Sequence, residues 1–415
     1  MQPAHLTFDV VILGAGASGL MCALTAGQRG RRVLVLEKAN KPGKKILMSG
    51  GGKCNFTNLN VEPDNFISNN PHFCKAALKR YTQWDFIDLV HRHGIPYEER
   101  SHGQLFCLGS AKDILAMLLE ECSRAGVVLK THCDVRAVTA LSGEVILQEG
   151  GHPSCRYRVE LNQGDHTLQV TAHSLVVASG ALSIPTLGGS GIGYDIARQF
   201  GLGLVERRAG LVPFMFSDSM KAICERLSGL ALPVAVSCNG RTFHENLLFT
   251  HRGISGPVIL QISNYWHPGD AILVDLLPGR DVGDWLLEAK RLHGRQKLRT
   301  VLSDSLARGL VSELQSLWWP EQAEKTLAEF ADKTLLAIGQ HLNGWRLKPS
   351  ATEGYRTAEV TLGGVDTNDI SSRTMEARKQ PGLYFVGEVL DVTGHLGGYN
   401  FQWAWSSGYS AGLAV

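Results

Sequence analysis

The chain opens with short apolar runs on either side of a helical pattern. Residues 9–13 form a short apolar, β-branched run that begins with Asp9, and residues 32–37 form a second apolar run that ends in Glu37. Between them, residues 18–29 have the apolar spacing and length of a helix. Strand, helix and strand within 29 residues predict a βαβ unit, whose strands are parallel and whose crossover is right-handed.

The next part of the chain alternates helical and strand-like patterns. Helices are predicted over 71–93, with Thr82 and Asp85 as an N-terminal cap, and from Ser110 and Asp113 to about residue 126. Short strand patterns with polar turns follow and predict a β-meander at 127–130, 135–140, 145–148, 157–161 and 168–170. Residues 175–178 form another fully apolar strand.

The pattern changes between about 195 and 350 and then returns. Strands of a separate β layer are predicted at 212–216, 232–237 and 271–276, and a mostly helical stretch at 282–342. From about residue 357 onward, glycine-rich segments like those near the start of the chain occur again. We therefore expect an α/β protein with a first domain over 1–194, an insertion over 195–350 (β-rich 195–280, helical 281–350), and a return to the first domain over 351–415.

Composition narrows the class of protein. With 44% hydrophobic and 19% charged residues, the chain has the material for folded cores, and a net charge of +2 supplies no global field for nucleic acid or membrane. The nine cysteines include no C-x-x-C pair, which argues against a disulfide scaffold, a zinc site or a dithiol motif. We expect reduced thiols, no metal and a cytoplasmic protein. Glycine is in excess, at 46 of 415 residues.

Two uncharged stretches have the length of a membrane span. They cover residues 10–28 and 396–415. Glycines interrupt the first, and Asn, Gln and Ser interrupt the second. We interpret both as buried strand–helix segments and expect no membrane association.

The first predicted turn contains the fingerprint G-x-G-x-x-G at Gly14, Gly16 and Gly19. In a dinucleotide-binding turn the first glycine permits the tight turn, the second lets the pyrophosphate approach the backbone, and the third lets helix pack on strand. Glu37 ends the second strand, where a carboxylate can accept hydrogen bonds from ribose hydroxyls and would repel a 2′-phosphate. This pattern predicts FAD or NAD in preference to NADP.

A second glycine-rich loop at 41–55 favours FAD. Its sequence, KPGKKILMSGGGKCN, combines lysines with consecutive backbone N–H groups that suit phosphate. A protein that binds only NAD rarely needs such a loop directly after its first βαβ unit. The alternative is a flexible surface loop.

Six segments resemble the BaiN-like (YhiN-like) flavoproteins, also called aminoacetone-oxidase-family FAD enzymes. They read ILGAGASGL at 12–20, KKILMSGGGKCNFTN at 44–58, FTHRGISGP at 249–257, TLGGV at 361–365, GLYFVGEVLD at 382–391 and GGYNFQWAW at 397–405. The resemblance covers essentially the whole chain. It departs at Lys53, where most members carry Arg, so the bidentate contact of a guanidinium is lost.

The resemblance implies a two-dinucleotide-binding-domain FAD fold whose nucleotide domain is split by a β-barrel-like and helical insertion. It also implies that 387–391 contacts the flavin end, with Asp391 near the ribityl chain or pyrophosphate, and that the helix beginning near 397–402 lies beside the flavin pyrimidine. There its positive end would stabilise reduced flavin. The predicted cofactor residues are Gly14, Ala15, Gly16, Ala17, Ser18, Gly19, Glu37, Lys38, Lys45, Ser49, Gly50, Gly51, Gly52, Lys53, Cys54, Asn55, Val135, Ala178, Ser179, Gly180, Gly387, Glu388, Asp391, Gly397, Gly398, Tyr399, Asn400 and Phe401.

The candidates for catalysis are few. Cys54 could be a reactive thiol or a buried packing residue, His251 a proton donor or a structural histidine, and Tyr399 a proton donor. Ser255, after His251, is a candidate helix cap. The glycine-rich loop 188–193 could bind NAD(P)H, although no strand leads into it, and the resemblance places it near FAD instead.

These patterns predict a FAD-dependent oxidoreductase that transfers hydride between a small organic substrate and non-covalent FAD. The second redox partner would be O₂ or NAD(P)H, and the residues leave this choice open. We expect a small-molecule substrate, no nucleic acid and no stable protein partner. The alternative is a flavin-containing RNA-binding or RNA-modifying protein that uses the basic run Lys290, Arg291, Arg295, Lys297 and Arg299.

Overall fold

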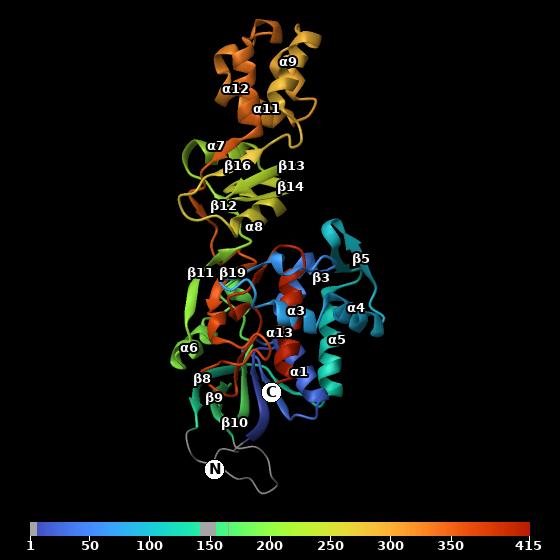
Figure 1. Ribbon diagram of the computed structural model, residues 1–415, viewed down its shortest axis with the longest axis vertical. Coiled ribbons are helices and arrows are strands. Elements are labelled where there is room, and N and C mark those ends of the chain that lie inside the picture. Colours follow the sequence, from blue (N-terminus) through green and yellow to red (C-terminus); the bar gives the residue numbers. More distant parts are fainter. Residues whose placement is uncertain (1–5, 142–154, 165) are drawn as a thin grey trace. The chain divides into compact units, whose positions relative to one another are not determined.

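The computed structural model describes residues 6–141, 155–164 and 166–415, which form two compact units (Figure 1). The first unit is made of Met1–Arg208 and Glu359–Val415, and the second of Ala209–Ala358. The chain thus leaves the first unit once and returns to it. The second unit begins and ends later than the insertion expected at 195–350, because the strand at Leu204–Gly210 pairs with a strand of the returning segment.

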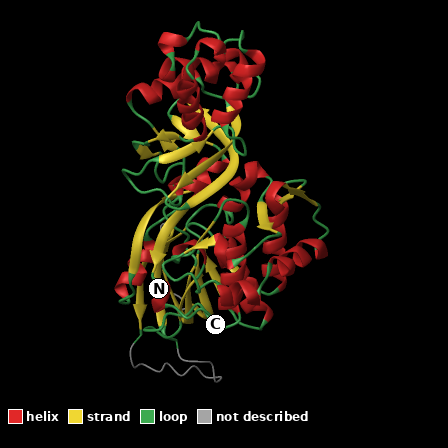
Figure 2. Cartoon of the chain, turned by 45° about the horizontal axis from the view of Figure 1, so that its top comes forward, coloured by secondary structure: helices red, strands yellow, loops and turns green. Residues whose placement is uncertain are grey.

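The first unit is built on a seven-stranded sheet (Figure 2). Its order is β7–β2–β1–β10–β9–β8, with β20 also paired to β10. The strands are β1 (Leu6–Leu13), β2 (Val33–Leu36), β7 (Val128–Lys130), β8 (Cys133–Ala140), β9 (Tyr157–Gln163), β10 (His166–Val177) and β20 (Leu383–Phe385). The pairs of β1 with β2 and β10, of β2 with β7 and of β10 with β20 are parallel, whereas β8 and β9 extend the sheet antiparallel.

This arrangement confirms the predicted βαβ unit and corrects one detail. Strand patterns at 168–170 and 175–178 were expected to be separate, but both belong to the single strand β10 up to Val177. One edge of β10 pairs with β1, while its other edge pairs first with β9 and then with β20. The predicted strand at 145–148 lies outside the described residues.

Helices α1 (Ala17–Gln28) and α13 (Tyr399–Gly412) pack against each other. A Cβ at Gly408 would lie 2.4 Å from the Ser18 carbonyl oxygen, and one at Gly412 would lie 2.6 Å from Cβ of Thr25. Only glycine allows so close an approach, which explains two helix-weakening residues inside α13. The two uncharged stretches of the sequence are therefore β1 with α1, and α13.

Smaller elements complete the first unit. Its other α-helices are α2 (Lys44–Met48), α3 (Lys75–Arg80), α4 (Gln83–Arg92), α5 (Ala111–Arg124) and α6 (Ile192–Gln199). One small sheet has the order β3 (Asn55–Asn58), β6 (Gln104–Cys107) and β5 (Tyr97–Arg100). Two further sheets have two strands each and pair β4 (Phe66–Ile67) with β21 (Thr393–Gly394), and β11 (Leu204–Gly210) with β19 (Val360–Val365). The capping boxes predicted at Thr82 and Ser110 are both present, at the starts of α4 and α5.

The second unit combines an antiparallel sheet with a helical part. The sheet has the order β17–β16–β13–β14–β15–β12–β18, from strands β12 (Phe214–Met215), β13 (Ala231–Cys238), β14 (Arg241–Thr250), β15 (Gly253–Ser255), β16 (Ile272–Asp275), β17 (Trp345–Leu347) and β18 (Ala351–Thr352). The helices are α7 (Asp218–Arg226), α8 (Pro257–Ser263), α9 (Val282–His293), α10 (Leu298–Leu302), α11 (Arg308–Trp318) and α12 (Asp332–Asn343).

Each unit has its own hydrophobic core. In the first unit the core centres on the buried strands β1, β2 and β10 and on α1. Over the residues that the structure describes, no helix combines the length and apolar character of a membrane span.

Candidate cofactor site

The turn between β1 and α1 has the geometry of a dinucleotide-binding turn. Gly14 has a φ of 109°, and a Cβ there would lie 2.4 Å from the Ala178 carbonyl oxygen. A Cβ on Gly19 would lie 2.0 Å from the Gly14 carbonyl oxygen, whereas nothing lies within 4 Å of the corresponding position on Gly16. Gly14 and Gly19 thus permit close packing of the backbone around the turn, and Gly16 leaves open space beside it. No side chain caps α1, so its N–H groups remain available to phosphate.

Glu37 lies beside this turn, directly after β2. Its Oε2 accepts a hydrogen bond from the Ala15 N–H at 2.8 Å and its Oε1 accepts one from the Ala39 N–H at 2.7 Å. A carboxylate has about four acceptor positions, so two remain for ribose hydroxyls. The neighbouring Lys38 pairs with Asp134 of β8 at 3.1 Å.

The loop 41–55 lies against the same turn. The Gly43 N–H donates to the Ala15 carbonyl at 2.9 Å, which fixes the start of α2. Gly50, Gly51 and Gly52 all have left-handed φ angles, of 55°, 65° and 87°. At Gly51 and Gly52 the space where a Cβ would lie is empty, as a loop that lets a ligand reach its backbone requires.

Lys45 in this loop has two side-chain partners. Its Nζ lies 2.7 Å from both the Ser183 Oγ and the Glu388 Oε2. Ser183 donates from its hydroxyl to the Glu388 Oε1 at 2.7 Å, and the Thr361 N–H donates to that same oxygen at 3.0 Å. Four segments that are distant in sequence therefore meet at one carboxylate.

Segment 387–391 is held against α1 and α13. A Cβ on Gly387 would lie 2.5 Å from the Ser18 Oγ. Asp391 is buried and accepts hydrogen bonds from the Asn69 N–H at 2.8 Å and from the Ser68 hydroxyl at 3.4 Å. Burial raises the pKa of the Asp391 carboxyl above its usual value. Its side chain is thus engaged by loop 68–69.

The amino end of α13 is shaped by two glycines with left-handed φ angles, Gly397 at 119° and Gly398 at 93°. A Cβ on Gly398 would lie 2.4 Å from the Thr57 carbonyl oxygen. With the amide of Asn55 turned so that Oδ1 faces the helix, that oxygen accepts from the Gly398 N–H at 3.2 Å. Asn400 bonds the backbone of Gly394 through both ends of its amide, at 2.8 and 2.9 Å. The sequence prediction did not include the hydrogen bond by which Asn55 of β3 holds the start of α13.

The catalytic candidates occupy different environments. Cys54 is fully buried with a φ of 49°, and burial raises the pKa of its thiol to about 12. Tyr399 is buried at the start of α13, and burial raises the pKa of its hydroxyl. His251 is exposed in the turn between β14 and β15 of the second unit. Ser255 is not a helix cap, because Gly256 takes the N-cap position of α8 and no side chain caps it.

The sequence prediction missed Ser183 and Thr361 as site residues. Ser183 is fully buried three residues after Gly180, and the Thr361 Oγ1 accepts from the Ser183 N–H at 3.1 Å. Two features of the sequence could have identified them: Ser183 is a polar residue shortly after an apolar strand, and Thr361 is the first residue of the TLGG motif. The segment 188–193 runs into α6, which begins at Ile192, and it is preceded by a short 3-10 turn at Pro185–Leu187 instead of a strand of the sheet.

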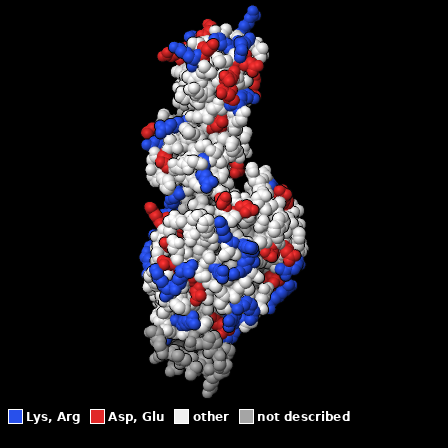
Figure 3. Space-filling model, in the orientation of Figure 1, with Lys and Arg blue, Asp and Glu red and all other residues white. Residues whose placement is uncertain are grey.

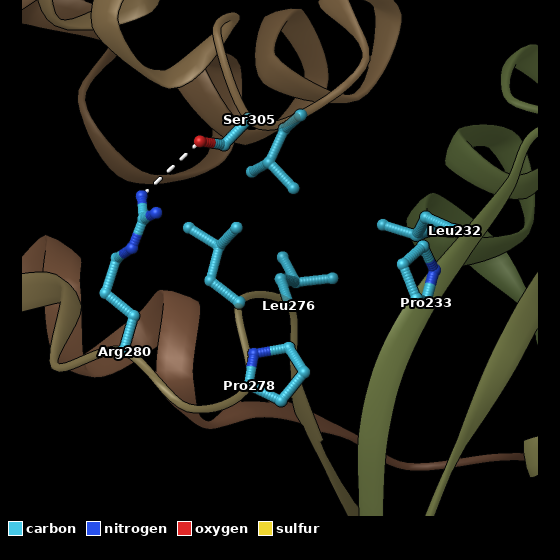
Figure 4. Close-up of a pocket in the computed structure, with 8 residues that line it drawn as sticks. Leu232, Pro233, Leu276, Pro278, Arg280 and Ser305 are labelled. Atoms are coloured by element: carbon cyan, nitrogen blue, oxygen red, sulfur yellow. Dashed lines mark hydrogen bonds between the residues drawn. The ribbon is translucent and has the colours of Figure 1, made fainter.

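The second unit contains a cavity of about 230 Å³ between its sheet and its helices (Figure 4). The Arg280 Nη1 lies 3.4 Å from the Ser305 Oγ at its edge. The remaining lining is apolar and consists of Leu232, Pro233, Leu276, Leu277, Pro278 and Leu306. This chemistry suits an apolar group better than a charged one.

Three of the five cations of the basic run in the second unit are paired with carboxylates. Lys290 pairs with Asp332 at 2.6 Å, and Lys297 and Arg299 both pair with Glu324. Arg291 and Arg295 are exposed. Figure 3 accordingly shows acidic and basic side chains intermixed over the α9–α12 end of this unit.

Comparison with known proteins identifies the class. The HI0933-like protein Rossmann domain family matches residues 8–414, and the chain belongs to this family. The match confirms the predicted family resemblance and the Rossmann-type FAD-binding fold, and it supports the assignment as an oxidoreductase.

Three curated relatives match the chain over nearly its full length. A ribosomal RNA dihydrouridine synthase of Escherichia coli (strain K12) is 51% identical over 405 residues, which cover 97% of this chain and 96% of the relative. A protein of the same name from Haemophilus influenzae is 46% identical and covers 98% of both chains. A 3-dehydro-bile acid delta(4,6)-reductase of Clostridium scindens is 27% identical, covering 97% of this chain and 98% of the relative.

Proposed function

We propose that this chain is a FAD-dependent reductase that converts a uridine of ribosomal RNA into dihydrouridine. One observation carries the proposal: two relatives that are 51% and 46% identical over at least 96% of each chain share the name ribosomal RNA dihydrouridine synthase. The more distant relative is named a reductase too. Both names favour reduction over the oxidase chemistry that the sequence left open.

The site geometry supports a bound dinucleotide. The open space at Gly16 and the uncapped start of α1 would receive the diphosphate, and the free acceptor positions of Glu37 would hold the ribose. Loop 49–55 and the start of α13 would bind the flavin half. FAD supplies hydride transfer when bound.

The proposed reaction adds two hydrogens to the C5–C6 double bond of uracil. A hydride goes to one carbon and a proton to the other, and NAD(P)H supplies the two electrons. Tyr399 lies at the start of α13, and its hydroxyl is protonated at neutral pH. We propose it as the proton donor, because Cys54 is fully buried and out of reach of an RNA base.

The proposal replaces the expected small-molecule substrate with RNA. A net charge of +2 is compatible with this choice, since a substrate needs local rather than global positive charge. NAD(P)H is the proposed second redox partner. The basic run of the second unit is not part of the proposal, because three of its five cations are paired with carboxylates.

The test uses purified protein and a ribosomal RNA transcribed in vitro, which carries no modified nucleotides. Under anaerobic conditions NADH or NADPH should bleach the flavin, and the transcript should restore its absorbance with formation of dihydrouridine, measured by nucleoside mass spectrometry. Protein that takes up no FAD would refute the cofactor assignment. Flavin that is reoxidised by a 3-dehydro-4,6-diene bile acid and not by RNA would place the chain with the bile-acid reductase instead.

A further inference from the structure

Lys45, Ser183 and Glu388 form a closed triangle of hydrogen bonds in the first unit. All three sides measure 2.7 Å, from the Lys45 Nζ to the Ser183 Oγ, from the Lys45 Nζ to the Glu388 Oε2, and from the Ser183 Oγ to the Glu388 Oε1. Ser183 is fully buried, and the Lys45 and Glu388 side chains are only 32% and 20% exposed. Such partial burial makes this ion pair less screened than a surface pair.

The triangle lies next to the dinucleotide-binding turn. On one side, α2 carries Lys45 and is bonded to that turn by the Gly43 N–H and the Ala15 carbonyl at 2.9 Å. On the other side, Gly387 precedes Glu388 and approaches Ser18 of α1 so closely that a Cβ would lie 2.5 Å from its Oγ. A change of charge in the triangle would therefore act on a group bound at the start of α1.

The contacts of Glu388 show why it needs a partner. Its carboxylate accepts from an ammonium, a hydroxyl and the Thr361 N–H. Removing the ammonium would leave a half-buried negative charge with only neutral donors, beside the site of a cofactor with a negatively charged diphosphate. Removing the carboxylate charge as well would leave no uncompensated negative charge beside that diphosphate.

We propose that Lys45 and Ser183 are positioning residues that act on the cofactor through Glu388, and that Lys45 is not itself a diphosphate ligand. This inference rests on the FAD binding that we propose above. Lys45 neutralises Glu388, and Ser183 fixes the orientation of its carboxylate. The triangle thereby keeps the charge beside the cofactor near zero and joins α2 to segments 181–183 and 387–391.

The competing role is direct contact between Lys45 and phosphate, as the sequence of loop 41–55 predicts. The two roles differ in their dependence on Glu388. A direct ligand would contribute the same amount whether or not Glu388 is charged, whereas a neutralising partner would contribute little once the carboxylate is gone. A double-mutant cycle between Lys45 and Glu388 separates them.

The experiment measures the dissociation constant of FAD from the apoprotein, by flavin fluorescence, and the midpoint potential of the bound flavin. The variants are K45M, E388Q, the double variant and S183A, with K44M of the same helix as the matched control. We expect K45M to weaken FAD binding at least tenfold and to make the potential more negative. In the E388Q background the same substitution should change the dissociation constant by no more than about twofold.

Equal weakening by K45M in both backgrounds would overturn the inference and make Lys45 a direct ligand. So would an effect of K44M as large as that of K45M. Should K45M fail to fold, K45R keeps the charge, and its FAD affinity should stay closer to wild type than that of S183A if pairing with Glu388 is what matters. Wild-type protein that binds no FAD would refute the proposed function itself, so the two failures are distinguishable.

Discussion

Thr57 of β3 donates a hydrogen bond from its hydroxyl to the Oε1 of Gln402 in α13 at 2.7 Å, and both side chains are fully buried. The amide nitrogen of Gln402 in turn donates to the Tyr81 carbonyl and to the Ser406 hydroxyl, each at 3.1 Å. Both ends of the buried Gln402 amide thus have partners inside the protein, and the bond to Thr57 ties α13 to β3 beside the proposed flavin site.

Replacing Thr57 by Val should destabilise the first unit. The substitution keeps the shape of the side chain but leaves the Gln402 Oε1 buried without its donor, at a cost of about 1–3 kcal/mol. Urea unfolding measures this cost, and T57V combined with Q402M should recover part of it because both polar partners are then gone. A T57V protein as stable as wild type would contradict the role given to this bond.

Gly14 and Gly16 should differ in their response to alanine. A Cβ at Gly14 would overlap the Ala178 carbonyl at 2.4 Å, so G14A should lower the melting temperature of the apoprotein. The position on Gly16 is open, so G16A should leave that temperature nearly unchanged while weakening FAD binding by tenfold or more. Melting curves without FAD and titrations with FAD test the pair. Equal loss of stability in both variants would argue against an open diphosphate site.

The stability of the protein should fall in alkaline solution. Burial raises the pKa of Cys54 to about 12 from an ordinary value near 9. An unfolded chain therefore loses this proton at lower pH than the folded one, and the stability contributed by the neutral thiol is complete below pH 9 and is lost as pH rises towards 12.

One such thiol contributes a slope of at most about 1.4 kcal/mol per pH unit in this window. Unfolding free energies of wild type and C54A between pH 8 and 11 check the prediction, and the variant should show the shallower decline. Rapid alkylation of Cys54 by iodoacetamide in the folded protein at pH 8 would contradict its burial.

The paired cations of the basic run should contribute little to any binding of RNA. Lys290 and Lys297 are held by Asp332 and Glu324, so K290Q with K297Q should change the salt dependence of RNA affinity by less than the roughly 0.9 per phosphate expected for each free cation. The control replaces the exposed Arg291 and Arg295 with Gln. A loss of slope near two for the lysine pair would show that RNA displaces these carboxylates.

Local patterns were sufficient to predict the first βαβ unit, the caps at Thr82 and Ser110 and the glycine turn, because each depends on residues close together in sequence. They could not reveal that Lys45 meets Glu388 and Ser183, since that contact depends on how α2, the segment after β10 and the segment after β20 converge. Ser255 failed as a cap for a related reason. It ends β15, so its backbone belongs to the sheet, and Gly256, with a φ of 90°, makes the turn into α8.

The packing of α13 on α1 through Gly408 and Gly412 also bears on biosynthesis. The ribosome makes α1 first and α13 last, with all of Ala209–Ala358 in between. The second unit can therefore bury its own core while the first unit still lacks β20 and α13. Closure of such distant contacts is slow compared with local folding. FAD uptake would then follow completion of the chain, and a truncated product would carry a folded second unit but no assembled flavin site.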